Sequence, residues 1–183
     1  MNDADKDYLL KLARNTLDKY ILTGDTYAPD DVPDSLKQKS GTFVTLTVAG
    51  DLRGCIGSLT PGEPIFKSVI NNTVNAAVDD PRFPPVDATE LKRIKIEVSV
   101  LTPMKRLDHS GPDDLLARLR PDIDGVWLQL RGHGATYLPD VWEHFSDKKG
   151  FLESLCQKAG LPPDAWKDPE AKIFIYQTIK FGE

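Results

Sequence analysis

The chain has little of what most often marks a catalytic, metal-binding or membrane protein. Only two of its 183 residues are cysteines and three are histidines, and none stands at the spacing of a metal-binding motif. No apolar run is long enough to span a bilayer, and no run of Lys and Arg suggests a nucleic-acid-binding face. We therefore expect no tightly held metal, no cofactor, no membrane segment and no nucleic-acid partner.

The charge balance and the first residues narrow the class further. Lys and Arg number 23 against 28 Asp and Glu, a formal net charge of -5, which argues against a transcription regulator. The start of the chain, residues 1–7, is acidic and polar and lacks the apolar segment of a signal peptide. The Rossmann glycine fingerprint and the Walker phosphate loop are both absent. Because Cys55 and Cys156 lie far apart in sequence, we predict free thiols and a cytoplasmic location.

Hydrophobic periodicity predicts an α+β fold, with an antiparallel sheet flanked by helices. The patterns indicate helices at residues 3–22, 64–79, 111–120 and 146–159, and strands at 42–49, 52–57, 94–101, 125–131, 135–138 and 173–179. Turns at Gly50-Asp51 and Gly132-His133-Gly134 would join two hairpins, which favours antiparallel pairing. A chain of 183 residues is long enough for one domain, so residues 1–183 are predicted to form a single domain.

The most unusual segment is the predicted strand Leu52-Arg53-Gly54-Cys55-Ile56-Gly57. Strict alternation would turn Leu52 and Ile56 toward the core and would place Arg53 and Cys55 together on the other face. Glycine weakens a strand unless another group must come close to it. Gly54 and Gly57 therefore indicate the close approach of a ligand, of a partner, or of the loop at residues 81–85 of the same chain.

The hexapeptide and its surroundings supply the candidate catalytic residues. Cys55 is either a nucleophile or redox-sensitive thiol, or a small buried side chain. Glu97 is either a general base or the salt-bridge partner of Arg53. His133 is the weakest candidate, since it is either a proton-transfer group or a solvated residue at a turn. Cys156 lies on the apolar stripe of a helix and is predicted to belong to the core.

The candidate ligand- or partner-binding residues are Arg53, Gly54, Gly57, Arg82 and Phe83. Two guanidinium groups suit the bidentate binding of a carboxylate or phosphate. The alternative is that each arginine holds a loop in place through backbone carbonyls or through Asp79 and Asp80.

Several further blocks along the chain carry a family resemblance, together with Leu52–Gly57. They are Asp80–Val86, Glu97–Pro103, Asp124–Val126, Gly134–Trp142 and Lys158–Trp166, in this order. Together they resemble the AMMECR domain family, and the version here is similar to the bacterial form called AmmeMemoRadiSam system protein A. Asp140 departs from the pattern, which has glutamine or glutamate there.

The resemblance implies an α+β domain with a larger and a smaller lobe, in a family with no established biochemical activity. It also implies association with a Memo-like protein and with a radical SAM enzyme in prokaryotes. We therefore expect a ligand- or partner-binding component of a modification system. The alternative is an enzyme or covalent carrier that uses Cys55 with Arg53 on a small anionic or peptide substrate, so whether the protein is catalytic stays open. The lone thiol lacks an adjacent base in sequence, which favours the binding role.

Overall fold

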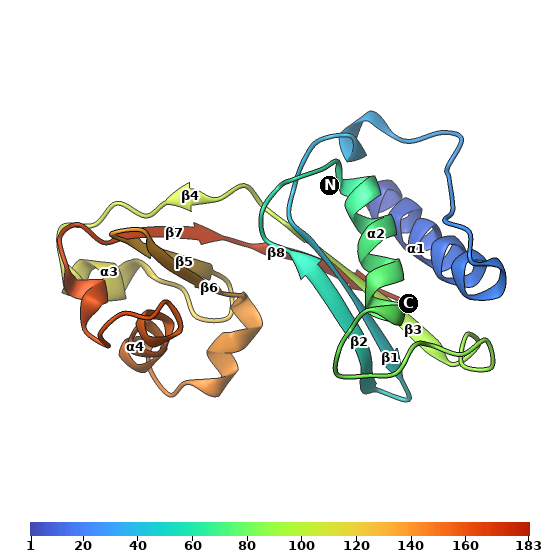
Figure 1. The fold of residues 1–183 in the computed structure, drawn as a ribbon. Helices are drawn as coiled ribbons and strands as arrows, with labels where there is room; N and C mark the ends of the chain where they lie inside the picture. The colour runs from blue at the N-terminus through green and yellow to red at the C-terminus, as the bar shows by residue number, and fades with distance from the viewer. The chain divides into compact units, whose positions relative to one another are not determined.

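The computed structural model describes residues 1–183, and the chain divides into two compact units (Figure 1). Unit 1 comprises Met1–Leu101 and Ile179–Glu183, and unit 2 comprises Thr102–Thr178. Each unit has its own four-stranded sheet and its own hydrophobic core. The predicted α+β class with antiparallel strands is confirmed. None of the helices combines the length and the apolar character that a membrane crossing requires.

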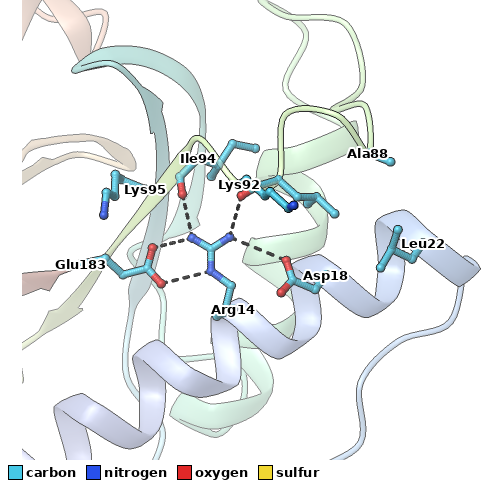
Figure 2. A pocket seen from close by; sticks show the side chains of 9 residues that line it. Arg14, Asp18, Leu22, Ala88, Lys92, Ile94, Lys95 and Glu183 are labelled. Atoms are coloured by element: carbon cyan, nitrogen blue, oxygen red, sulfur yellow. Dashed lines mark hydrogen bonds and ion pairs between the residues drawn. The ribbon is translucent and has the colours of Figure 1, made fainter.

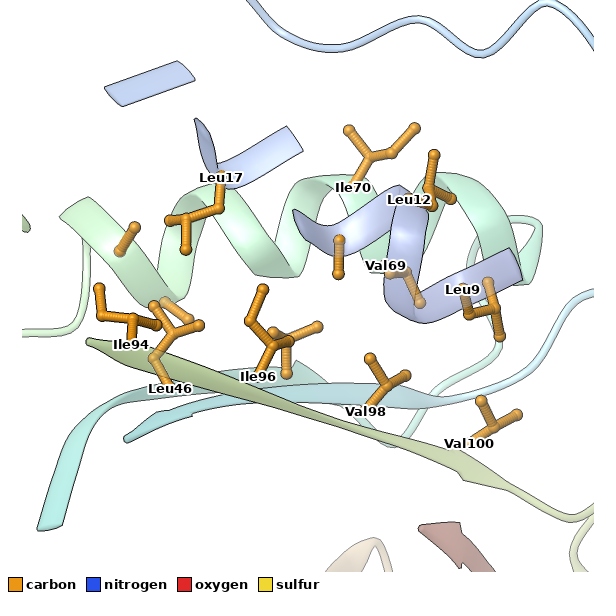
Figure 3. Close-up of a cluster of buried hydrophobic side chains, with 14 of the residues drawn as sticks. Leu9, Leu12, Leu17, Leu46, Val69, Ile70, Ile94, Ile96, Val98 and Val100 are labelled. Carbon is orange, nitrogen blue, oxygen red and sulfur yellow. The ribbon is translucent and has the colours of Figure 1, made fainter. Parts of the chain in front are cut away.

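Unit 1 packs two helices on one face of the sheet β2-β1-β3-β8. The strands are β1 (Thr42–Val48), β2 (Asp51–Ser58), β3 (Ile94–Leu101) and β8 (Thr178–Gly182), and the helices are α1 (Asp3–Thr23) and α2 (Ile65–Val78). Figure 3 shows the core between them, where Leu9 and Leu17 of α1 and Val69 of α2 lie over Ile96 and Val98 of β3.

Local sequence accounts for these elements. Asn2 and Asp5 form a reciprocal capping box at the start of α1, and Gly24 ends the helix with a left-handed φ of 77°. In β1, Val44 and Leu46 are fully buried while the alternate residues Thr45 and Thr47 are not, as period-2 alternation predicts. The helix-facing residues of β1 thus set the face on which α1 and α2 pack.

Unit 2 is built around the sheet β4-β7-β5-β6. Its strands are β4 (Lys105–Arg106), β5 (Gly125–Leu130), β6 (His133–Tyr137) and β7 (Lys172–Tyr176), with helices α3 (Pro112–Arg118) and α4 (Lys148–Lys158). Short 3-10 helices lie at Asp34–Leu36 in unit 1 and at Pro139–His144 and Ala165–Lys167 in unit 2. In the core of unit 2, the rings of Trp142 and Phe151 stack with centroids 3.5 Å apart.

The structure corrects the predicted hairpin turns by one residue. The first turn is Ala49-Gly50, with φ values of 54° and 91°, and the second is Arg131-Gly132, with 49° and 84°. Two consecutive positive φ angles are typical of the primed turns that join antiparallel strands. His133 and Gly134 consequently belong to β6 rather than to the turn.

The last predicted strand is in fact two strands. The alternation at 173–179 is divided at Gln177 between β7 in the sheet of unit 2 and β8 in the sheet of unit 1. Thr102 and Gln177 are hydrogen-bonded to each other where the chain passes from β7 to β8. The Thr102 N–H donates to the Gln177 carbonyl at 2.8 Å, and the Gln177 N–H donates to Thr102 Oγ1 at 2.8 Å. A local sequence pattern cannot predict these two hydrogen bonds, because they join residues that are distant along the chain.

Candidate functional site

A β-bulge interrupts the alternation of the hexapeptide strand. Leu46 pairs with Gly54 and Thr47 pairs with Leu52, so Arg53 is the extra residue on β2. Beyond the bulge, Leu52 turns to the face of Thr47 and is 41% exposed. The prediction that Leu52 packs inward is therefore wrong, because strict alternation ends at the bulge. Ile56, opposite Val44, does pack against the core.

The two glycines of β2 are explained by groups of the same chain. A Cβ at Gly54 would lie 2.0 Å from the carbonyl oxygen of Ala76, near the end of α2. A Cβ at Gly57 would lie 2.3 Å from the ring of Phe43 on β1 and 2.4 Å from the Thr42 carbonyl oxygen. The close approach predicted at both positions is real. The approaching groups are a helix end, an aromatic ring and strand backbone.

Asp80 closes the outer edge of β2. Its Oδ2 accepts the Cys55 backbone N–H at 2.8 Å, and Arg82 Nη2 donates to the Cys55 carbonyl at 3.3 Å. Since β2 is an edge strand, these side chains satisfy backbone groups that a neighbouring strand would otherwise bind. Side chains from one loop thus replace a fifth strand at this position.

The Asp80–Arg82 pair is bidentate. Arg82 Nε lies 2.9 Å from Asp80 Oδ1 and Arg82 Nη2 lies 2.7 Å from Oδ2, while the Arg82 backbone N–H also donates to Oδ1 at 3.1 Å. The guanidinium of Arg82, with the backbone N–H groups of Cys55 and Arg82, holds the pKa of the buried Asp80 carboxyl well below its usual range. Asp80 is therefore charged at neutral pH.

Arg53 holds the segment that follows. Its guanidinium donates to both oxygens of Glu90, at 2.7 and 2.9 Å, and to the carbonyls of Pro84 and Pro85 at 2.9 and 3.2 Å. The bond to Arg53 and the Asp87 backbone N–H lower the pKa of Glu90. The contacts of Arg53 and Arg82 agree with the reading in which each arginine holds a loop in place, with Glu90 as an additional acid.

Residues 81–85, called here the proline loop, are thus fastened at both ends and exposed between them. Asp80 and Arg82 tie its start to Cys55, and Arg53 ties its end to β2. Phe83 is half-buried, with the Arg82 guanidinium 5.5 Å from its ring centroid, while the three prolines of the loop and Arg82 are exposed. Three prolines in five positions also restrict the backbone. The attachments and the prolines together restrict the conformation of the loop while most of its residues stay exposed.

Cys55 faces a row of polar side chains on the sheet face that α1 and α2 leave open. Its Sγ lies 3.2 Å from Thr45 Oγ1, and Thr45 pairs with Cys55 on one side and with Glu97 on the other. Glu97 Oε1 is 3.5 Å from Lys180 Nζ, so the predicted salt bridge between Glu97 and Arg53 is wrong. The strand order accounts for this, because β1 separates the strand of Arg53 from that of Glu97.

The remaining candidates lie in unit 2. His133 is an exposed residue at the start of β6, and its Nδ1 donates to the Ala159 carbonyl at 3.2 Å. Cys156 is fully buried on α4, as predicted, and burial raises the pKa of its thiol. Arg53, Cys55 and Arg82 thus lie together in unit 1. His133 lies in unit 2, where it binds the Ala159 carbonyl.

A cavity of about 670 Å³ in unit 1 lies between α1, the start of β3 and the end of the chain (Figure 2). Its central group is Arg14, whose guanidinium binds the Glu183 carboxylate and the carbonyls of Leu91 and Ile94, with Asp18 3.7 Å away. The donors of Arg14 are occupied by the protein itself. The arrangement ties α1 to β3 and to the last residue rather than offering a free cation to a ligand.

Sequence reasoning missed two residues that contact the candidate residues of unit 1, Glu90 at Arg53 and Thr45 at Cys55. Glu90 follows Arg53 by 37 residues, and no local pattern links the two. Thr45 was recognisable only as a polar position of β1, and its contact with Cys55 depends on the register of the hairpin. Asp80 was identifiable from its proximity to Arg82 in sequence, although its bond to the Cys55 N–H was not.

These features define a class of α+β protein with two small sheets in two units, in which a proline loop closes the edge of a glycine-rich strand. The chain belongs to the AMMECR1 family, whose family model matches residues 10–181. A protein of Methanothermobacter thermautotrophicus is 40% identical over 177 residues, covering 96% of this chain and 92% of the relative. Protein PF1979 of Pyrococcus furiosus is 38% identical over 184 residues, covering 97% and 87%.

A solved structure has the same fold. The crystal structure of the uncharacterized protein PH0010 from Pyrococcus horikoshii matches with a TM-score of 0.84 at 36% identity, covering 100% of this chain and 93% of that one. The predicted family and fold class are confirmed. These relatives are archaeal, so the narrower likeness to the bacterial form stays a prediction.

Proposed function

We propose that this AMMECR1-family protein is a binding component that docks a protein partner on the proline loop and the adjoining edge of β2. The observation that carries the proposal is the fastening of the loop by Arg53 and Asp80 while Arg82 and the prolines remain exposed. A loop held rigid before binding loses little conformational entropy on docking. Arginine and aromatic side chains are also the types that most often dominate interface energies.

The family resemblance indicates which proteins to test as the docking partner. A Memo-like protein and a radical SAM enzyme are the first two candidates, with this chain acting as the component that presents or positions a substrate. We place this role in the cytoplasm, where the free thiols of Cys55 and Cys156 would stay reduced.

Substitution of Phe83 by alanine is expected to weaken binding of the Memo-like protein from the same organism by about tenfold or more. The half-buried ring packs beneath the Arg82 guanidinium at the exposed part of the loop, and its loss removes both contact area and support. Calorimetry with the two purified proteins measures the effect, and the same titration is repeated with the radical SAM enzyme.

Arg82→Gln serves as a second variant and Cys55→Ser as the matched control, which should bind as the parent does. Thermal unfolding of each variant shows whether unit 1 is intact. Equal affinity for parent, Phe83→Ala and Arg82→Gln with both partners would remove the support for docking at this loop.

A second function is favoured by the contact between Cys55 Sγ and Thr45 Oγ1, with Glu97 opposite Thr45 on the same sheet face. In this alternative, Cys55 is the nucleophile or covalent attachment point for a small anionic or peptide substrate. Arg53 is the expected anion-binding residue, although its donors are occupied by Glu90 and two carbonyls. Binding of a substrate by Arg53 therefore requires release of the proline loop.

Alkylation separates the two functions. In a Cys156→Ser background, a catalytic Cys55 should react with iodoacetamide faster than free cysteine at neutral pH, with a midpoint below the value of an ordinary thiol, which is about 8.5. The pH dependence of the labelling rate is the measurement. Slow labelling with an ordinary midpoint would argue against a nucleophilic Cys55 and leave the binding role in place.

A further inference from the structure

Besides the cavity of unit 1, the protein has a cavity of about 440 Å³ in unit 2, on the sheet face opposite the core of that unit. Val126 and Leu128 of β5 are fully buried in that core, so Trp127 and Gln129 between them point to the other face. Gln129 pairs with Gly134 on one side and with Lys172 on the other. The cavity, called here the Trp127 pocket, falls within the roughly 300–1,000 Å³ that is typical of small-ligand sites.

Three polar groups of the Trp127 pocket have no partners within the protein, whereas Arg131, His133 and Glu170 at its rim do. The Trp127 indole N–H, the Gln129 amide and the Lys172 ammonium make no hydrogen bond or ion pair to any other residue, although the Trp127 ring packs near Phe174 with centroids 6.3 Å apart. Arg14 in the unit 1 cavity of Figure 2 differs, because all three nitrogens of its guanidinium donate to groups of the protein. These three neighbouring polar groups, one of them on the Trp127 ring, are free to bind a ligand, and an aromatic surface with a few convergent polar groups is typical of a recognition site.

Gly134 keeps the edge of the indole accessible. A Cβ at this position would lie 3.1 Å from Trp127 Nε1 and 3.2 Å from the Leu128 carbonyl oxygen. Gly134 does not have the positive φ that would by itself favour glycine, so the space is the physical reason for a small residue here. Any side chain at position 134 would therefore restrict the access of a ligand to the indole N–H.

The cation without an anionic partner in the pocket is Lys172. Arg131 is paired with both Asp168 and Glu170, at 2.9 Å from each, so these three side chains together carry one formal negative charge and do not attract an anion themselves. A nucleic-acid strand requires a row of cations that follows its phosphates, and the pocket has one free cation. One positive charge beside a ring and an amide suits a planar ring that carries a single anionic group.

We propose that the Trp127 pocket binds a small heteroaromatic anion of the size and chemistry of a nucleoside monophosphate. The ring of the ligand stacks on Trp127 and hydrogen-bonds to the Gln129 amide and the indole N–H, and the phosphate or carboxylate of the ligand pairs with Lys172. This site is independent of the proline loop and of Cys55.

Intrinsic fluorescence tests the proposal directly. Trp142 and Trp166 are only 3% and 2% exposed, so a ligand that enters the pocket should quench Trp127 selectively. The titrants are AMP and nicotinate, which carry a ring with a phosphate or a carboxylate, together with adenosine, which lacks the charge, and inorganic phosphate, which lacks the ring. We expect saturable quenching by AMP, by nicotinate or by both below about 1 mM, and at least about fivefold weaker binding of adenosine and phosphate.

Lys172→Gln should weaken binding of the better titrant by about fivefold or more, while Lys149→Gln, an exposed lysine of α4 outside the pocket, should leave it unchanged. Calorimetry with Trp127→Phe and Gly134→Ala gives a readout that does not depend on the fluorophore, and both variants should bind more weakly. The proposal is overturned if neither anion quenches saturably, or if adenosine binds as well as AMP and Lys172→Gln has no effect. Much tighter binding of a thymidine decanucleotide than of AMP would also overturn it, in favour of a nucleic-acid strand.

Discussion

Alanine in place of Gly54 is expected to destabilise unit 1 by more than about 3 kcal/mol, enough to prevent accumulation of folded protein if the parent has ordinary stability. The added Cβ would lie 2.0 Å from the Ala76 carbonyl oxygen, which is a backbone atom and cannot rotate away. β2 cannot shift to relieve the clash, because it is paired along its length with β1 on one side and bound by Asp80 on the other.

Gly62→Ala is the matched control for this prediction. A Cβ at Gly62 would have no atom within 4 Å, and Gly62 does not have a positive φ, so alanine there should change the free energy of unfolding by no more than about 0.5 kcal/mol. Urea unfolding followed by circular dichroism gives both values, provided that the m-value is unchanged. A Gly54→Ala protein within about 1 kcal/mol of the parent would show that α2 moves away from β2 at little cost.

Asp80→Ala is expected to lower the free energy of unfolding by about 2–4 kcal/mol. The substitution leaves the Cys55 N–H without its acceptor and deprives Arg82 of its bidentate partner, so the proline loop loses its first attachment. Asp79→Ala is the natural control, because Asp79 is the exposed neighbour whose side chain forms no hydrogen bond or ion pair. Urea unfolding at pH 7 measures both variants.

The Asp80 contribution should also depend on pH. Because the pKa of Asp80 in the folded protein is depressed, its stabilisation is fully present above the pKa of an unfolded aspartate, about 3.9, and is lost as the pH falls through the folded pKa. The difference in unfolding free energy between parent and Asp80→Ala should therefore be constant from neutral pH to about pH 5 and shrink below about pH 4. A difference that stays constant down to about pH 2 would mean that the bonds of Asp80 do not depend on its charge.

The elements with strong local patterns were predictable from the sequence. The strand at Ile94–Leu101 was predicted with its observed bounds, because four apolar residues alternate with polar ones over its length. α1 was predicted to within a residue because its apolar stripe ends at a glycine. β4 was not predicted, since two residues cannot display a period.

The candidate site was predicted in part. The two glycines of β2 indicated close approach, and both are indeed approached. Alternation failed at Arg53, however, because a bulge inserts one residue into one strand of a pair, and only the pairing partner reveals the insertion. The error over Leu52 follows from that limit, whereas Glu90 was missed because its bond to Arg53 joins side chains that are 37 residues apart in sequence.

The sequence by itself determined the α+β class, the family and the helices and most strands, because these depend on local periodicity and on blocks of residues that stand in a fixed order. Only the tertiary structure decided that the 173–179 pattern serves two sheets, that Asp80 and Arg82 close the edge of β2, and that Arg53 binds Glu90. The physical reason is the same in each case. Hydrogen bonds and ion pairs between distant residues depend on distances in space, and such distances leave no periodic trace along the chain.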